Sequence, residues 1–193
     1  MPNWCSTAYA IEGDANEIQD LYKLMKGLED MEIPSVPNGF GTSWLGCLVD
    51  ALGTDWQNVR CRGSWSCLEL EEDVLKFSTE TAWCPCNEVL DLVREKFPSL
   101  RYYYMTEEPG MEIYETNDDA GIYFPDRYYL DVCTPEEDYY NEYFTELQDV
   151  FKWLEDELGQ PVKSTADIEN LDAQWREEND NSFCNLLEFK VMV

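Results

Sequence analysis

The sequence predicts an α+β fold in which helices cover one face of a four-stranded antiparallel sheet, with an insert and a C-terminal helical extension. Segments of alternating apolar and polar residues, typical of half-buried strands, are interleaved with segments whose apolar residues recur every three or four positions, as in helices. Over residues 1–110 the order is strand, helix, strand, strand, helix, strand. The 193 residues are 44% hydrophobic, which suits a globular domain with an appendage.

A first strand is predicted at residues 3–11, where positions 5, 7, 9 and 11 share one face. The helix after it begins at Asp14, which caps the first turn, with Glu17 three positions later in a capping-box arrangement. Its apolar stripe consists of Ile18, Leu21, Tyr22, Met25 and Leu28. An insert of about residues 31–62 follows, with a loop rich in proline and glycine, a short helix and a turn.

The middle of the chain predicts a hairpin, a crossover helix and a returning strand. The hairpin strands lie at 65–70 and 74–81. The helix starts near Pro85 and ends at Phe97, because the proline that follows forces Phe97 out of the helical conformation. The tyrosines at 102–104 favour the returning strand. Two such halves give the ferredoxin-like arrangement, in which we expect strand 74–81 to lie next to strand 3–11.

Beyond Gly110 we predict two more strands, at 111–116 and 121–132. Residues 134–137 (Thr-Pro-Glu-Glu) have the pattern of a helix start, with a cap, a proline at the first position and a glutamate at the third. Apolar residues continue this helix to Gly159, which is a suitable C-cap.

A shorter helix opens at Ser164, and residues 183–193 form a final strand. We therefore expect one domain at residues 1–132 and an acidic C-terminal helical extension, ending in a strand, at residues 133–193.

Several short motifs occur in a characteristic order in the first two thirds of the chain. They are Met1-Pro2-Asn3-Trp4-Cys5, Gly53-Thr54-Asp55-Trp56, Phe77-Ser78-Thr79-Glu80-Thr81-Ala82-Trp83 with Pro85, Phe97-Pro98 and Glu108-Pro109-Gly110. In this order they resemble the YubB-type ferredoxin-like domain family, whose members are encoded on plasmids, phages and other mobile elements. The resemblance covers residues 1–132 and implies a ferredoxin-like fold and a bacterial, intracellular setting, but no activity. The family usually has lysine where Asp55 stands.

Charge and composition exclude several classes of function. The formal net charge is −28, with 41 acidic and 13 basic residues, which argues against binding nucleic acid phosphates or anionic membranes. The absence of histidine excludes Ser-His-Asp and Cys-His catalysis and removes the commonest metal ligand. The sequence shows no signal peptide and no apolar run of the roughly 20 residues that span a bilayer. We therefore expect a cytoplasmic protein without enzymatic activity or cofactor.

Two groups of side chains suggest metal chemistry, and each has a simpler interpretation. Cys84 and Cys86, with Cys61 and Cys67, could hold zinc or exchange disulfides, or could pack as small buried residues, since we expect all eight cysteines to be reduced. A dense set of carboxylates suggests a calcium or magnesium site or glycosidase-type acid–base catalysis, although an acidic hairpin edge explains it as well. This set is Glu107, Glu108, Glu112, Glu115, Asp118 and Asp119.

Aromatic residues at the starts of strands and helices suggest a ligand pocket, although they often serve as core packing. The tryptophans concerned are Trp4, Trp44, Trp56, Trp65 and Trp83. The pocket hypothesis combines Trp4, Trp56 and Trp83 with Glu107 and Glu108.

The strongest functional signal is an acidic segment with interleaved aromatic residues. Residues 106–157 contain 17 acidic residues and two basic ones. Acidic charge mixed with tyrosine suits docking on a basic protein partner, and on a mobile-element protein this extends to imitation of DNA. The predicted contact residues are Glu136, Glu137, Asp138, Tyr139, Glu142 and Tyr143. The alternatives are a metal-dependent enzyme or ligand-binding protein that uses a carboxylate cluster, and a solvated helix face above buried tyrosines.

Overall fold

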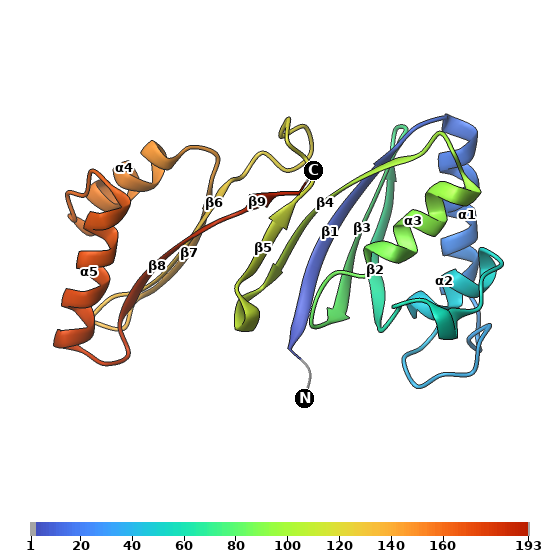
Figure 1. Ribbon diagram of the computed structural model, residues 1–193, viewed down its shortest axis with the longest axis horizontal. Helices are drawn as coiled ribbons and strands as arrows, with labels where there is room; N and C mark the ends of the chain where they lie inside the picture. Colours follow the sequence, from blue (N-terminus) through green and yellow to red (C-terminus); the bar gives the residue numbers. More distant parts are fainter. Residues whose placement is uncertain (1–2, 193) are drawn as a thin grey trace. The chain divides into compact units, whose positions relative to one another are not determined.

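The computed structural model describes residues 3–192, and the chain divides into two compact units, Met1–Asp118 and Asp119–Val193 (Figure 1). The described part is an α+β protein with five α-helices. No helix within residues 3–192 is long and apolar enough to cross a membrane. The boundary expected after Val132 falls inside a strand of the second unit.

The first unit is built on an antiparallel sheet with the strand order β2-β3-β1-β4-β5. The strand expected at 74–81 does lie beside the first strand, with Cys5 opposite Thr81 and Ile11 opposite Leu75. Of the segment 111–116, expected as a further strand, residues 113–116 pair with β4 and extend this sheet. The strands are β1 (Trp4–Glu12), β2 (Gly63–Glu71), β3 (Val74–Ala82), β4 (Arg101–Glu108) and β5 (Ile113–Thr116).

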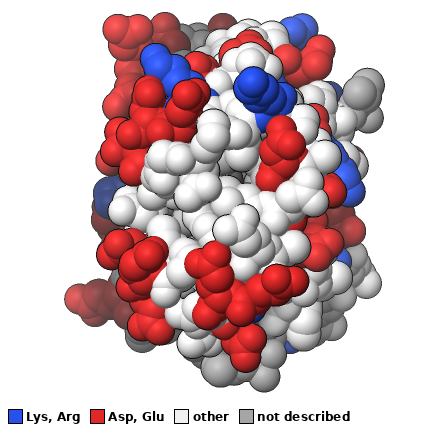
Figure 2. All heavy atoms as spheres, turned by 90° about the vertical axis from the view of Figure 1, so that its left-hand side faces the viewer, with Lys and Arg blue, Asp and Glu red and all other residues white. Residues whose placement is uncertain are grey.

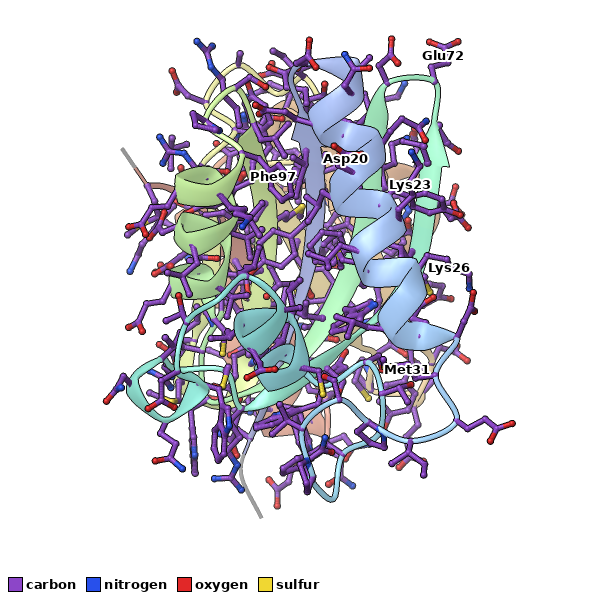
Figure 3. All side chains as sticks on the ribbon, turned by 90° about the vertical axis from the view of Figure 1, so that its right-hand side faces the viewer. Asp20, Lys23, Lys26, Met31, Glu72 and Phe97 are labelled. Atoms are coloured by element: carbon purple, nitrogen blue, oxygen red, sulfur yellow. The ribbon has the colours of Figure 1, made fainter. Side chains whose placement is uncertain are left out.

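Three helices cover one face of this sheet, namely α1 (Ala15–Glu29), α2 (Leu45–Ala51) and α3 (Asn87–Lys96) (Figures 1 and 3). Asp14 caps α1 as expected, because its carboxylate accepts hydrogen bonds from the N–H groups of Asn16 and Glu17. Glu17 does not complete a capping box. Its carboxylate accepts instead from the backbone N–H and the hydroxyl of Ser99, at 3.0 and 2.8 Å, and so ties the start of α1 to the turn before β4.

The core of the first unit lies between the sheet and these helices. The strands contribute Tyr9, Ile11, Leu75 and Phe77, all nearly inaccessible to solvent. The helices bury Ile18, Leu21, Met25, Val89, Leu90 and Val93 against them. Burying one such side chain stabilises the fold by about 1.5–3 kcal/mol.

Two local details differ from the sequence prediction. Pro85 lies two residues before α3 and outside it, with Cys86 as the N-cap residue. Residues 53–55 form the expected turn, but Trp56 then opens a short 3-10 helix, η1 (Trp56–Asn58), which Asp55 caps by accepting from the N–H of Gln57. A second short 3-10 helix, η2 (Pro109–Met111), follows β4.

The second unit is a small sheet with two helices, where a mainly helical extension was expected. Its antiparallel strands have the order β7-β6-β8, and its core combines Leu130 and Val132 of β6 with residues of both helices, including Leu154 and Trp175. The elements are β6 (Tyr128–Cys133), β7 (Tyr139–Phe144), α4 (Leu147–Leu158), α5 (Thr165–Glu178), β8 (Phe183–Glu188) and the short β9 (Lys190–Val191). Val193, included in the predicted last strand, lies outside the described residues.

The helix start predicted at residues 134–137 is wrong: these residues form the turn between β6 and β7. The N–H of Glu137 donates to the carbonyl of Thr134 at 2.9 Å, and the N–H of Thr134 donates to the carbonyl of Asp138 at 2.9 Å. Glu137 adopts a left-handed conformation with φ = 69°. A three-residue loop that ends in a left-handed residue commonly closes a hairpin. The helix begins only at Leu147.

Candidate functional site

The candidate site is an open groove at one end of the second unit, with a volume of about 370 Å³. Three parts of the chain form it: the β6–β7 turn, the C-terminal end of α4 with the residues after it, and the last turn of α5. We call it the acidic groove. It is lined by Thr134, Pro135, Glu136, Asp138, Tyr140, Glu157, Leu158, Gln160, Gln174, Trp175 and Glu178.

The β6–β7 turn has a fixed geometry that presents two of the carboxylates. Besides the two backbone bonds across the turn, the hydroxyl of Thr134 accepts from the N–H of Asp138 at 3.2 Å. The amide of Asn179, just beyond α5, donates to the carbonyl of Pro135 at 3.1 Å. The turn is therefore tied to the end of α5, and Glu136 and Asp138 line the same groove as Glu178.

The groove carries negative charge that the described part of the chain does not neutralise. Its four carboxylates, those of Glu136, Asp138, Glu157 and Glu178, are exposed, and none of them forms an ion pair within residues 3–192. Glu178 accepts one neutral hydrogen bond, from the side-chain amide of Gln174 at 3.1 Å. No lysine or arginine is among the lining residues given above.

The end of α4 adds to this negative potential. Its last turn contains Glu155, Asp156 and Glu157 and no basic residue. A helix C-terminus carries a partial negative charge, which favours lysine or arginine and disfavours carboxylates there. Figure 2, which shows the side of the molecule that carries α4 and α5, displays many acidic side chains and few basic ones. This arrangement is unfavourable for the isolated protein and favourable for a cationic partner.

The groove also has an aromatic component. Trp175 is only 4% exposed and belongs to the core beneath the groove, while Tyr140 is half-buried and packs edge-on against Trp153 at 5.4 Å. Aromatic surface beside carboxylates suits the long side chains of lysine and arginine, whose apolar stems pack on rings while their charged ends meet the carboxylates.

The structure separates the six predicted contact residues. Glu136 and Asp138 line the acidic groove, and Glu137 is exposed at the tip of the turn beside them. Tyr139 and Tyr143 lie on the face of β7 opposite to Tyr140, because alternate residues of a strand point to opposite faces. The ring of Tyr143 packs against that of Tyr129 at 4.8 Å. Glu142 is exposed and shares the Tyr140 side of the strand.

The sequence prediction missed Glu157, Gln160, Gln174, Trp175 and Glu178 as lining residues. Glu157 and Glu178 stand at the C-terminal ends of α4 and α5. The sequence predicts the end of α4 at Gly159, although not its start, and no local pattern shows that the ends of the two helices meet. The accumulation of acidic residues in the last turn of α4 was the available signal, because it opposes the usual charge preference of a helix C-terminus.

The residues of the predicted tryptophan pocket lie in different surroundings. Trp4 and Trp83 are 47% and 42% exposed, whereas Trp56 packs edge-on against Trp44 at 5.1 Å. Glu107 and Glu108 are adjacent on β4 and so point to opposite faces of the sheet. Glu108 is 2% exposed, and its carboxylate accepts from the N–H of Gly110 at 3.1 Å, which caps η2.

No group of three or more cysteine and carboxylate side chains within residues 3–192 is arranged to hold a metal ion. All eight cysteines are free thiols, of which Cys67 is exposed and Cys61 and Cys86 are buried. Burial raises the pKa of the Cys86 thiol to about 12, so the group remains protonated at neutral pH. A thiol that stays protonated is a poor nucleophile.

A second open groove in the second unit, of about 490 Å³, provides a contrast. Its lining contains Arg127 and Lys190 as well as Glu146 and Glu188, so its charges balance. The acidic groove therefore differs in charge from another groove of similar size in the same unit.

Comparison of the chain with protein-family models, with curated proteins and with solved structures finds no match.

Proposed function

We propose that this chain is a non-enzymatic binding protein that docks its acidic groove onto a basic protein partner. The observation that carries the proposal is the set of four exposed carboxylates around one groove, none of which forms an ion pair within residues 3–192. A lysine or arginine from the partner would relieve the repulsion among them, and opposite charge would steer the encounter.

The surroundings of the groove support a protein partner rather than a free cation. Tyr140 is half-buried and offers part of its ring next to the carboxylates, above the buried Trp175. Tyrosine and tryptophan are enriched in protein interfaces, where they bury large area with little loss of side-chain freedom. The partner chemistry that fits is a surface with lysine or arginine side chains that can lie along these rings.

The first unit supplies the proposed scaffold, a ferredoxin-like domain of a cytoplasmic protein from a bacterial mobile element. The strand order β2-β3-β1-β4, with α1 and α3 over one face, supports this assignment together with the motifs that resemble the YubB-type family. A sharper form of the proposal is that the acidic surface imitates DNA and occupies a DNA-binding protein.

The test is capture of the partner from the native host with four proteins: the wild type, the neutralised variant Glu136→Gln/Asp138→Asn/Glu157→Gln/Glu178→Gln, and the controls Glu188→Gln and Glu146→Gln from the balanced groove. We expect the wild type and both controls to capture the same basic protein at low salt and to lose it as salt rises, because screening weakens exposed charge pairs. The neutralised variant should capture little of it.

A partner whose affinity changes with neither salt nor the fourfold substitution would exclude the acidic groove as the docking surface. Addition of a short DNA duplex then tests the sharper form. If the partner is held in place of DNA, the duplex should displace it, whereas a partner that the duplex leaves bound speaks against imitation of DNA.

A further inference from the structure

The loop between α1 and α2, residues 31–42, exposes three large apolar side chains. We call this segment the insert loop. Met31 is 45% exposed, Ile33 is 76% exposed and Phe40 is 50% exposed. Figure 3 shows Met31 directly beyond the C-terminal end of α1, where the insert loop begins. Several large exposed apolar side chains in one short segment indicate an interaction site.

The insert loop is held in one conformation by its own polar contacts. The side-chain amide of Asn38 donates to the carbonyls of Val36 and Gly41, at 2.8 and 3.2 Å, and its oxygen accepts from the N–H groups of Phe40 and Gly41, at 2.6 and 2.9 Å. Val36 is 8% exposed and anchors the middle of the segment in the core.

The two ends of the insert loop are also close together. The hydroxyl of Thr42 donates to the carbonyl of Glu29 at 3.3 Å, so the segment closes on itself as an Ω-loop does. A pre-ordered loop loses less conformational freedom on binding than a flexible one, which makes its exposed apolar groups more effective contacts.

An aromatic layer lies beneath Phe40. The Phe40 ring stacks on Trp44 at 6.0 Å, and Trp44 meets Trp56 at 5.1 Å. Trp44 is 5% exposed, and its indole N–H has no acceptor within residues 3–192. A buried donor without an acceptor is unfavourable. Trp44 lies next to Phe40 and Trp56 lies next to Trp44, so the two tryptophans would report binding at the Phe40 ring.

The charge around the insert loop indicates what kind of surface it fits. Residues 29–59 contain five acidic residues and no lysine or arginine. Asp30 and Glu32 are exposed and flank Met31, and Asp30 is partly neutralised by Lys26 at 3.3 Å. Exposed carboxylates thus flank Met31 at the start of the insert loop, and residues 29–59 contain no basic residue, which favours a partner with an apolar face edged by basic residues.

We propose that the insert loop is a docking surface that packs Ile33 and Phe40 against an apolar face edged by lysine or arginine on a partner protein. A second copy of the chain fits poorly, because each copy carries a net charge of −28. This surface belongs to the first unit and shares no residue with the acidic groove, so the inference goes beyond the proposed function and stands independently of it.

The experiment uses the full chain and a defined probe, a 14-residue helical peptide of leucine and lysine with one apolar face. The peptide lacks aromatic residues, so the protein's tryptophan fluorescence reports binding. The variant is Ile33→Ser/Phe40→Ser. The matched control is Ile122→Ser, which replaces a 63% exposed apolar residue in the second unit.

We expect Ile33→Ser/Phe40→Ser to weaken peptide binding about tenfold and the control to leave the affinity unchanged, since a few apolar anchors dominate such contacts. In Asp30→Asn/Glu32→Gln the affinity should depend less on salt than in the wild type. Ile33→Ser alone should weaken binding in the same direction, and because Ile33 is so exposed this single variant keeps the test valid if the double variant unfolds.

Equal affinity of Ile33→Ser and the wild type for the peptide would overturn the proposal. Two other outcomes would assign the insert loop a different binding partner. Sedimentation equilibrium that shows a dimer of the wild type, lost in Ile33→Ser, would assign the loop to a second copy. Sedimentation with neutral phosphatidylcholine vesicles, lost in the same variant, would assign it to a lipid surface.

Discussion

Glu137 is the residue whose substitution tests the turn geometry of the candidate site most directly. Its φ of 69° lies in the left-handed region, where a residue with a Cβ atom is disfavoured by roughly 1–2 kcal/mol. Glycine removes that penalty, but it also increases the conformational freedom of the unfolded chain, which costs about 0.5–1 kcal/mol. The balance predicts that Glu137→Gly is more stable than Glu137→Ala by about 0.5–1 kcal/mol.

The comparison of these two variants isolates the backbone, because both remove the carboxylate. Urea denaturation of the full chain measures the difference, and the transition should be followed through the second unit, whose tryptophans Trp153 and Trp175 lie in or against its core. Two units can unfold separately, so a single transition should not be assumed. If Glu137→Gly proves no more stable than Glu137→Ala, the left-handed turn at residue 137 is refuted, and with it the placement of Glu136 and Asp138 in the groove.

Three further predictions concern the rest of the chain. When the protein is unfolded without reductant, all eight cysteines should be alkylated, and an even number of unmodified cysteines would indicate disulfides. In the native state, mass spectrometry should find Cys67 modified first and Cys86 last. Leu154→Ala should destabilise the second unit by about 2–5 kcal/mol in denaturant titrations, because it leaves a cavity in the core. Hydrogen bonds from the backbone N–H groups of residues 16 and 17 hold the pKa of the Asp14 carboxyl below its ordinary value of 3.8. The stabilisation by the Asp14 carboxylate is therefore present above pH 3.8 and is lost as the pH falls through the lowered pKa. In acid titrations, Asp14→Asn should lose less stability than the wild type.

The sequence was sufficient to predict the helices and strands whose local residue pattern agrees with the way they pack in the fold. In the first unit, the Asp14 cap, the stripe from Ile18 to Leu28 and the alternation through β3 all describe elements that bury one face against a common core. The pairing of β3 with β1 followed from the order of these elements. Agreement between local pattern and global packing is what makes such segments predictable.

The sequence failed around residue 140 because two periodicities coincide there. Tyr140 and Phe144 are four residues apart, which places them on one face of a helix and also on one face of a strand. The preceding Thr-Pro-Glu-Glu run fits a helix start and a type I turn equally well. Tertiary pairing with β6 decides in favour of the strand, and both aromatic rings then pack near Trp153, at 5.4 and 6.5 Å.

The candidate site could be predicted only in part, for a related reason. Glu136, Asp138 and Glu157 lie in the acidic segment that composition identifies, but Glu157 and Glu178 reach the groove beside the β6–β7 turn only through the packing of α4 and α5. Whether the ends of two helices or strands lie close together depends on the tertiary fold, and no residue spacing in the sequence predicts it.

The last turn of α4 allows a test in which stability and binding should change in opposite directions. Glu157→Lys places a cation at the negative end of α4, which should stabilise the folded protein by about 0.3–1 kcal/mol. The same change puts a positive charge in the acidic groove and should weaken binding of a basic partner more than Glu157→Gln does, because it adds repulsion to the loss of an attraction. Glu169→Lys, an exposed position on α5 outside the groove, is the control for net charge, and it should affect binding little.

Thermal denaturation and partner affinity, measured on the same preparations, check both parts. A Glu157→Lys protein that is less stable than the wild type would show that the carboxylate has a structural role, whereas one that is more stable and still binds normally would show that the partner docks elsewhere. The expected pattern, higher stability with weaker binding, is that of a residue retained for recognition at the expense of the fold.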